Sequence, residues 1–464
     1  MSTVSLEHPR SAGNDRWLAG IVLGVLTFWL FAQSVINVVP DIKSSVAIPA
    51  ATLNLAISLS ALFSGCFIVA CGGLADRFGR VRLTRLGLWL SLAGSLMLVL
   101  AQESTLFLVG RAVQGLSAAC IMPATLALIK TWYQGAARQR AISFWVIGSW
   151  GGSGLCSLVG GAIATGIGWR WIFIISMLFA GLALLLLRGA QENRSEQAAR
   201  HRLDLPGLIL LAAALVLLNL FITKGRDWGW ASPATLGLLA GFVITALCFF
   251  RAERRRGGQA LIDFSLFANR AYSGAVISNM LLNGCIGTMM IASIYMQQGR
   301  QFSAFQTGLM TMGYLVTVLA MIRVGEKLLQ RYGARLPMMI GPVLTGLGIF
   351  FISCTFLGDT AYVATVFASY VLFGLGLGCY ATPSTDTAVS HAPHDKAGVA
   401  SGLYKMGSSL GGAFGLAISA SLYGLLLPLG MARAAQFALL ANTGLCLAAL
   451  VVVFLMVPRS NQLS

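Results

Sequence analysis

Long apolar segments recur along the whole chain with only short polar stretches between them, and this pattern limits the fold more than any other feature. About 20 apolar residues are enough for a helix to cross a bilayer. Only helices and closed barrels satisfy all of their backbone groups there. The residue-by-residue alternation of barrel strands is absent from these segments. We therefore expect an all-α polytopic membrane protein.

Fourteen transmembrane helices are expected, in groups of six, two and six, as in a twofold repeat with an inserted hairpin. Their predicted ranges are 17–39, 50–72, 83–101, 105–130, 141–163, 168–187, 205–223, 234–251, 271–297, 305–324, 335–357, 361–391, 397–425 and 433–457. The expected division is a cytoplasmic tail at 1–16, an N-terminal six-helix bundle at 17–187, a linker with two inserted helices at 188–270, a C-terminal six-helix bundle at 271–457 and a cytoplasmic tail at 458–464.

Charge content and charge position exclude several other classes of protein. Only 10% of the 464 residues are charged, whereas soluble domains contain about 25%. A net charge of +17 would suggest nucleic-acid binding in a soluble chain. Here the basic residues lie in short loops, mostly on one side of the expected membrane. We therefore expect no nucleic-acid partner and place both termini in the cytoplasm.

No pattern in the sequence indicates a catalytic or cofactor site. None of the nine cysteines forms a metal-binding spacing, and the four histidines lie at or outside the expected membrane boundaries. A nucleotide-binding loop is also absent. We expect no enzyme activity, no metal and no cofactor, so any transport must draw on an ion gradient or on the gradient of the substrate.

A polar sequence, GGLADRFGRVR, joins the second and third expected helices and is expected to form a tight hinge. Its pattern G-x-x-x-D-R-x-G-R resembles the signature loop of the major facilitator superfamily. That resemblance implies two six-helix bundles that rock about a midplane cavity. It also implies a gating role for the loop residues Gly72, Asp76, Arg77, Gly79 and Arg80. A degenerate second copy occupies 325–335, at the equivalent place in the last six helices.

Three charged residues stand out within the expected spans, where an unpaired charge is costly: Arg111, Asp386 and Lys405. Arg111 and Gln114 share a helix face and resemble the fourth-helix motif of the family, whose arginine is associated with proton coupling. The alternative is an arginine that extends to the outer interface. We expect Asp386 to carry the proton, because burial favours the protonated form of a carboxyl group. The alternative is a structural ion pair with Lys405.

Two further segments extend the resemblance to the fourteen-helix drug:proton antiporter family, and in particular to quinolone efflux pumps of the NorB/NorC type. The glycine-rich run 148–161 resembles the fifth-helix antiporter motif, with Cys156 and Ser157 where Gly-Pro is expected. In the first helix, Gln33 and its neighbours replace the aspartate that this family usually carries. That departure favours neutral or zwitterionic amphiphiles over multiply charged cations.

Polar and aromatic side chains of the expected spans are candidates to line a substrate cavity. Asn279 and Asn283, four residues apart, share one helix face. Aromatic side chains more often serve in packing or at the membrane interface, and that alternative remains open for the aromatic candidates. The full set of candidates is Gln33, Asn37, Gln114, Trp145, Asn279, Asn283 and Tyr314.

The resemblance implies a monomeric, proton-coupled multidrug exporter in the bacterial inner (cytoplasmic) membrane. Its partners would be lipids, protons and amphipathic drugs such as fluoroquinolones, quaternary ammonium compounds and dyes. A proton-coupled importer or a metabolite exporter of narrow specificity is the alternative within transport, and the altered Gly-Pro and missing aspartate favour it. A non-transporting receptor is the alternative outside transport, and charges within the spans argue against it.

Overall fold

The computed structural model describes residues 13–459 except 47, 49, 195–203, 257–261 and 263. Every regular element among these residues is helical, as expected. The predicted tails at 1–16 and 458–464 lie mostly outside the described residues.

The N-terminal half begins with a helix that changes its winding twice and continues with long helices joined by short turns. The elements are α1 (Asp15–Leu26), the π-helix η1 (Thr27–Ala32), the 3₁₀-helix η2 (Gln33–Asn37), α2 (Val39–Ser45), α3 (Ala50–Phe78), α4 (Arg80–Leu100), α5 (Ser104–Trp132), α6 (Gly135–Val146), the π-helix η3 (Ile147–Gly151), α7 (Gly152–Ile167) and α8 (Arg170–Leu186).

An inserted hairpin and the C-terminal half follow. The elements are α10 (Leu205–Trp228), α11 (Pro233–Arg256), η5 (Phe264–Ala268), α12 (Arg270–Gly284), α13 (Gly287–Ile294), the π-helix η6 (Tyr295–Gly299), α14 (Ala304–Tyr332), α15 (Arg335–Ile352), α16 (Asp359–His391), η7 (His394–Lys396), α17 (Ala397–Leu426), η8 (Leu427–Leu429) and α18 (Met431–Met456).

The predicted number of fourteen membrane-spanning segments is roughly consistent with the described helices. Eleven helices are long and apolar enough to cross a membrane, and the bent pair Gly135–Cys156 and Leu158–Ile167 provides one more span. The shorter apolar helices Arg170–Leu186 and Pro206–Ile222 account for the remaining two. Each of the fourteen predicted ranges therefore corresponds to one helical segment.

The polar motif joins two helices by a tight turn, but the helix ends predicted at residues 72 and 83 are wrong. α3 continues past Gly72 to Phe78, so Asp76 lies in its last turn and Arg80 begins α4. Only Gly79 separates the two helices, with a φ of 121° that favours glycine. The second copy is built in the same way, because α14 ends at Tyr332 and Gly333 follows with a φ of 76°.

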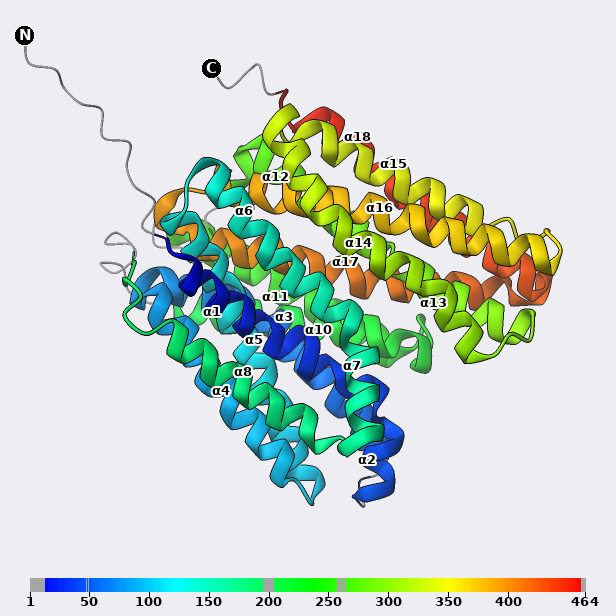
Figure 1. The fold of residues 1–464 in the computed structure, drawn as a ribbon, viewed down its shortest axis with the longest axis horizontal. Coiled ribbons are helices and arrows are strands. Elements are labelled where there is room, and N and C mark those ends of the chain that lie inside the picture. Colours follow the sequence, from blue (N-terminus) through cyan, green and yellow to red (C-terminus); the bar gives the residue numbers. More distant parts are fainter. Residues whose placement is uncertain are drawn as a thin grey trace, which may run out of the picture.

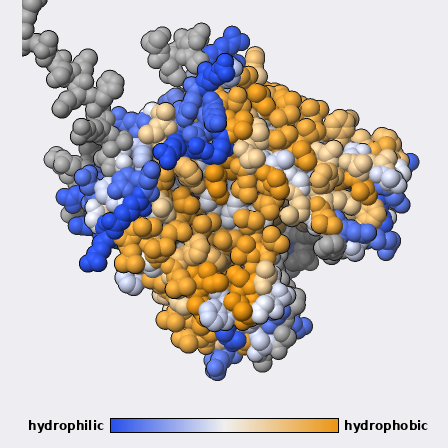
Figure 2. Space-filling model, in the orientation of Figure 1, coloured by the Kyte–Doolittle hydropathy of each residue, from blue (hydrophilic) through white to orange (hydrophobic). Residues whose placement is uncertain are grey.

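The helices form two groups that meet at one end of the molecule and diverge toward the other (Figure 1). The first turn of α1 and the last turn of α18 both lie at the end where the groups meet (Figure 1). An apolar surface covers most of the visible face, and hydrophilic residues gather toward the ends of the helices (Figure 2). This distribution is the one that a bilayer requires of a polytopic helical protein.

The hairpin α10–α11 lies outside both groups, at the seam between them. α10 contacts α3 of the first group and α17 of the second, and α11 packs on α10. Trp230, in the turn of the hairpin, donates a hydrogen bond from Nε1 to Ser421 Oγ of α17 at 3.0 Å. The hairpin therefore spans the joint between the groups without entering either one.

The two groups approach most closely where α3 meets α17. A Cβ atom on Gly72 would lie 2.3 Å from the carbonyl oxygen of Gly398, and a Cβ on Gly398 would lie 2.3 Å from that of Gly72. Only glycine allows the two backbones to lie so close together. The packing of α3 on α17 therefore depends on both residues.

Gly72→Ala is expected to lower the thermal denaturation midpoint of the detergent-solubilised protein by several degrees. The added methyl group must push α3 away from α17, and overpacking of this kind costs about 1–3 kcal/mol. Gly65→Ala on the same helix is the control, because nothing lies within 4 Å of the added atom. It should keep or raise the midpoint, since alanine is the better helix former by about 1 kcal/mol. Equal shifts for the two variants would contradict this account of the packing.

Candidate functional site

A cavity of about 690 Å³ lies between the two groups, lined by residues of η3 and α7 on one side and of α12, α13, α14 and α16 on the other. Its wall is mainly apolar and contains no charged side chain among the described residues. Its polar members are Ser153, Asn283, Thr311 and Tyr314, and its large apolar members include Trp150, Met289, Met312 and Phe373. Such a cavity suits an amphipathic ligand that carries an aromatic or aliphatic body.

Two of the seven predicted cavity residues line this space, Asn283 and Tyr314. Asn279 lies one turn below Asn283 and accepts a hydrogen bond from its Nδ2 at 2.9 Å. Gln33 is half-buried in η2 and is not part of the cavity wall. The side chain of Asn37 lies outside the described part of the chain. Gln114 and Trp145 are fully buried elsewhere, as described below.

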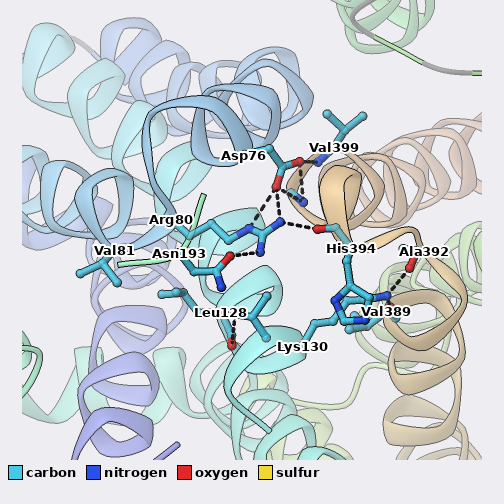
Figure 3. A network of polar contacts seen from close by, with 12 residues as sticks. Asp76, Arg80, Val81, Leu128, Lys130, Asn193, Val389, Ala392, His394 and Val399 are labelled. Atoms are coloured by element: carbon cyan, nitrogen blue, oxygen red, sulfur yellow. Dashed lines mark hydrogen bonds and ion pairs between the residues drawn. The ribbon is translucent and has the colours of Figure 1, made fainter. Parts of the chain in front are cut away.

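The end where the groups meet is held shut by contacts to the turn between α16 and α17, and we call this region the closed end. It comprises the C-terminal ends of α3 and α5, the first turns of α4 and α6, and the segment Asp386–Val399. Residues of the first group supply most of its charges (Figure 3).

Asp76 binds the first turn of α17 across the interface (Figure 3). Its carboxylate accepts the backbone N–H of Gly398 at 2.8 Å and that of Val399 at 3.0 Å. These amides belong to the N-terminal turn of a helix, where the backbone dipole favours a negative charge. Asp76 is 2% exposed, so little solvent weakens the interaction.

Arg80 neutralises Asp76 from the same side and adds a second contact across the interface. Its Nη2 donates to Asp76 Oδ1 and to the carbonyl oxygen of His394, each at 2.8 Å. Glu192 accepts the backbone N–H groups of Val81 and Arg82, each at 3.0 Å, and thereby caps α4. Of the predicted gating residues, Arg77 shows no hydrogen bond to the second group within the described residues, and its guanidinium lies 5.2 Å from the ring centroid of Phe78.

Lys130, near the end of α5, binds the C-terminal end of α16, on the other side of the turn between α16 and α17 (Figure 3). Its Nζ donates to the carbonyl oxygens of Val389 at 2.6 Å and of Ala392. These carbonyls belong to the end of α16, where the helix dipole favours a positive charge. A lysine and an aspartate of the first group therefore bind the two helix ends that flank one turn of the second group.

Asp386 forms an ion pair with Arg138 of α6, and the alternative that paired it with Lys405 is wrong. Arg138 Nε donates to Asp386 Oδ1 at 2.9 Å, and the two side chains are 21% and 7% exposed. Asp386 lies in the last two turns of α16, which ends at His391, the same residue at which the expected span ends. The pair joins the two groups.

Lys405 instead places its Nζ 4.4 Å from the ring centroid of Trp145. Trp145 belongs to α6 and donates from Nε1 to Thr125 Oγ1 at 2.9 Å, which fixes the ring. This cation–π contact also joins the two groups, because Lys405 belongs to α17.

Arg111 is completely buried within the first group. It donates to the carbonyl oxygens of Ala32 and Ala56 at 2.7 and 3.2 Å, to Ser60 Oγ at 2.7 Å and to Gln114 Oε1 at 2.8 Å. The predicted proximity of Arg111 and Gln114 is therefore observed. The alternative of an arginine that extends to the outer interface does not fit, since these acceptors hold its guanidinium inside the group.

Lys130, Arg138 and Glu192 were not predicted to be site residues. Lys130 and Arg138 each stand at a helix end beside the closed end, but basic residues are common at cytoplasmic helix ends. Their partners lie 259 and 248 residues further along the chain. The sequence offered one signal for the two basic residues. Lys130 lies on the helix that carries Arg111, and Arg138 lies on the helix that leads into the glycine-rich segment.

The whole chain matches known proteins. Residues 21–253 and 272–464 match the family model described as Major Facilitator Superfamily. The chain is 49% identical over 451 residues to "Quinolone resistance protein NorB" of Staphylococcus aureus strains MRSA252 and JH9, which covers 97% of this chain and 97% of each relative. The similarity to NorB-type proteins that was predicted from the sequence is thus confirmed.

Two solved structures share the fold at low sequence identity. The human organic anion transporter MFSD10 (TETRAN) has a TM-score of 0.66 at 16% identity, with 96% of this chain and 100% of that chain covered. The proton:xylose symporter XylE has a TM-score of 0.64 at 15% identity, with coverages of 96% and 95%. Both comparisons confirm the predicted fold class.

Asp76→Asn is expected to speed the amide hydrogen exchange of Gly398 and Val399 by about tenfold or more. Hydrogen bonds to a charged group contribute about 1.5–3 kcal/mol, and the neutral amide side chain is a weaker acceptor. Exchange is followed by mass spectrometry on peptides that cover 392–403. Asp15→Asn is the control, because the Asp15 side chain is 76% exposed. Unchanged exchange at both amides would show that Asp76 does not hold the start of α17.

Proposed function

Because the chain belongs to the major facilitator superfamily, we propose that it exports amphipathic drugs, quinolones among them, by proton antiport. The cavity between the two helix groups is the observation that carries this proposal. The name of the 49% identical relatives, quinolone resistance proteins, supports the choice of substrate. The chain is an integral membrane protein and a transporter rather than an enzyme.

Alternating access follows from where the contacts between the groups lie. Asp76, Arg80, Lys130 and Arg138 join the groups at the closed end, and the helices diverge toward the other end (Figure 1). With the termini in the cytoplasm of a bacterial cell, this state faces outward. Transport then requires these contacts to break so that the cavity opens to the cytoplasm.

The cavity wall supports amphipathic substrates without a high positive charge. An aspartate or glutamate in the wall would favour cations, and none of the described lining residues is acidic. Trp150 and Phe373 offer aromatic faces, and Met289 and Met312 offer adaptable apolar contacts. Asn283, Tyr314 and Thr311 supply hydrogen bonds that orient a ligand.

Proton coupling is assigned to Asp386, with Arg111 as an accessory group inside the first helix group. Protonation of Asp386 would remove one charge of its ion pair with Arg138. A half-neutralised pair loses its attraction and leaves the arginine without its partner. A proton taken up by Asp386 therefore weakens a contact between the groups, and this links protonation to the change of state.

The hairpin α10–α11 is assigned a place outside the transport path. No described residue of the hairpin lines the cavity, and the hairpin packs on the seam between the groups. We assign residues 17–187 and 271–457 to the two moving bundles, with 188–270 as an insertion. We also propose that the protein acts as a monomer.

Asp386→Asn is expected to abolish norfloxacin and ethidium efflux that depends on the proton gradient. The amide side chain does not ionise, so it can neither carry the coupled proton nor form an ion pair with Arg138. Efflux from pump-deficient cells is measured with and without a protonophore, and immunoblotting of membranes confirms equal expression. Wild-type protein should export at least one of the two compounds in a protonophore-sensitive way, and absence of export would overturn the proposed function.

Asp359→Asn is the matched control for this experiment. Asp359 accepts from Arg300 Nη1 at 2.6 Å at the opposite end of α16, so the variant removes an ion pair of similar kind within one helix group. It should retain most of the efflux. If Asp386→Asn exports as well as this control does, Asp386 is not the coupling group.

A further inference from the structure

The charges of the chain are distributed unevenly with respect to membrane depth. Every acidic residue in a described helix lies within about two turns of a helix end, and the deepest are Glu326 in α14 and Asp386 in α16. Lys405 and Arg111 lie about two turns inside α17 and α5. Arg323 of α14 pairs with Glu326, whereas Lys405 and Arg111 have no carboxylate within 4.0 Å among the described residues.

Lys405 differs from Arg111 in how its charge is accommodated. Four oxygen acceptors surround the Arg111 guanidinium. Lys405 is 8% exposed, and no carboxylate of the described residues lies within 4.0 Å of its ammonium. The contact that stabilises it is the face of Trp145, 4.4 Å away. An aromatic face is a weak substitute for an anion, so the lysine can still bind a negative group.

A polar path connects Lys405 with the cavity. Asn283 lines the cavity and donates to Asn279 Oδ1 at 2.9 Å. Asn279 donates from Nδ2 to Ser408 Oγ at 2.5 Å and to the carbonyl oxygen of Tyr404 at 3.3 Å. Ser408 and Lys405 are three residues apart on α17 and share one face. Lys405 therefore lies about one helical turn from Ser408, the last of the polar residues that extend from the cavity.

The first helix group also connects the cavity with Lys405. Trp145 and the cavity residue Trp150 are five residues apart on the segment formed by α6 and η3. Because Trp145 belongs to the first helix group and Lys405 to the second, their contact exists only while the groups are closed at this level. Separation of the groups toward the cytoplasm would free the ammonium.

We propose that Lys405 binds the carboxylate of an amphipathic anionic or zwitterionic substrate, and that Trp145 replaces the carboxylate as its partner after the groups close. Lys405 is exposed to the cytoplasmic entrance in the state that takes up substrate. The aromatic body of the ligand then occupies the apolar cavity above it. This assignment rests on the proposed function as an exporter. It applies to those substrates that carry an acidic group beside an apolar body.

The test compares norfloxacin with its methyl ester, which keeps the aromatic body and lacks the carboxylate. Binding to the purified full-length protein in lipid nanodiscs is measured by equilibrium dialysis. Lys405→Met should weaken norfloxacin binding by about tenfold or more, the size expected for loss of a charged hydrogen bond. Binding of the ester should change less than about twofold, as expected for a group that the ester does not contact. Lys405→Arg, which keeps the charge, should retain preference for the acid over the ester.

Lys327→Met is the control for loss of a positive charge, because Lys327 is exposed near the end of α14. It should change neither affinity. Equal weakening of acid and ester by Lys405→Met, or loss of the acid preference in Lys405→Arg, overturns the carboxylate site and leaves the exporter proposal intact. If wild-type protein binds neither compound, both proposals fail. Should Lys405→Met fail to fold, the Lys405→Arg comparison still decides between these outcomes.

Discussion

The closed end depends on one electrostatic arrangement, in which two opposite charges of the first helix group bind the two helix ends beside a single turn of the second. Lys130 meets the carbonyls at the end of α16, and Asp76 meets the amides at the start of α17. Each charge has the sign that the adjoining helix dipole favours. Because their partners are backbone groups, the contacts do not depend on the side chains of the turn. The second group contributes backbone N–H and carbonyl groups here, and the first group contributes most of the charged side chains.

Close packing makes these contacts effective. Gly72 and Gly398 allow α3 and α17 to approach until Asp76 reaches the N–H groups of α17 directly. Side-chain volume at either glycine would separate the helices and admit water, and the larger effective dielectric constant would weaken every charge interaction nearby. The glycine pair, the aspartate and the arginine of the motif therefore form one unit, in which the glycines set the distance over which the charges act.

Much of this architecture follows from the sequence, but the pairing across the interface does not. Apolar length predicted the all-helical membrane fold, because a bilayer leaves few alternatives. The motif indicated Asp76 and Arg80, yet its glycines were interpreted as a hinge, since helix propensity does not say that α3 extends to Phe78. An ion pair of Asp386 with Lys405 was the alternative for this carboxylate, because both residues appeared at similar depth. The actual partner, Arg138, is 248 residues away on another helix group, and no local pattern specifies such a pair.

The contacts at the closed end differ in what can break them. The carbonyl oxygens that bind Lys130 carry no titratable group, and Asp76 is enclosed by two backbone amides and Arg80. Asp386 accepts a single described hydrogen bond, from a half-buried arginine at the rim. The protonation of Asp386 that we propose would leave the backbone contacts of Lys130 and Asp76 in place. Lys405 stands apart from these contacts, since its ammonium faces the Trp145 ring and no carboxylate of the described residues lies within 4.0 Å of it. A substrate carboxylate that binds Lys405, as we propose, therefore displaces no acid.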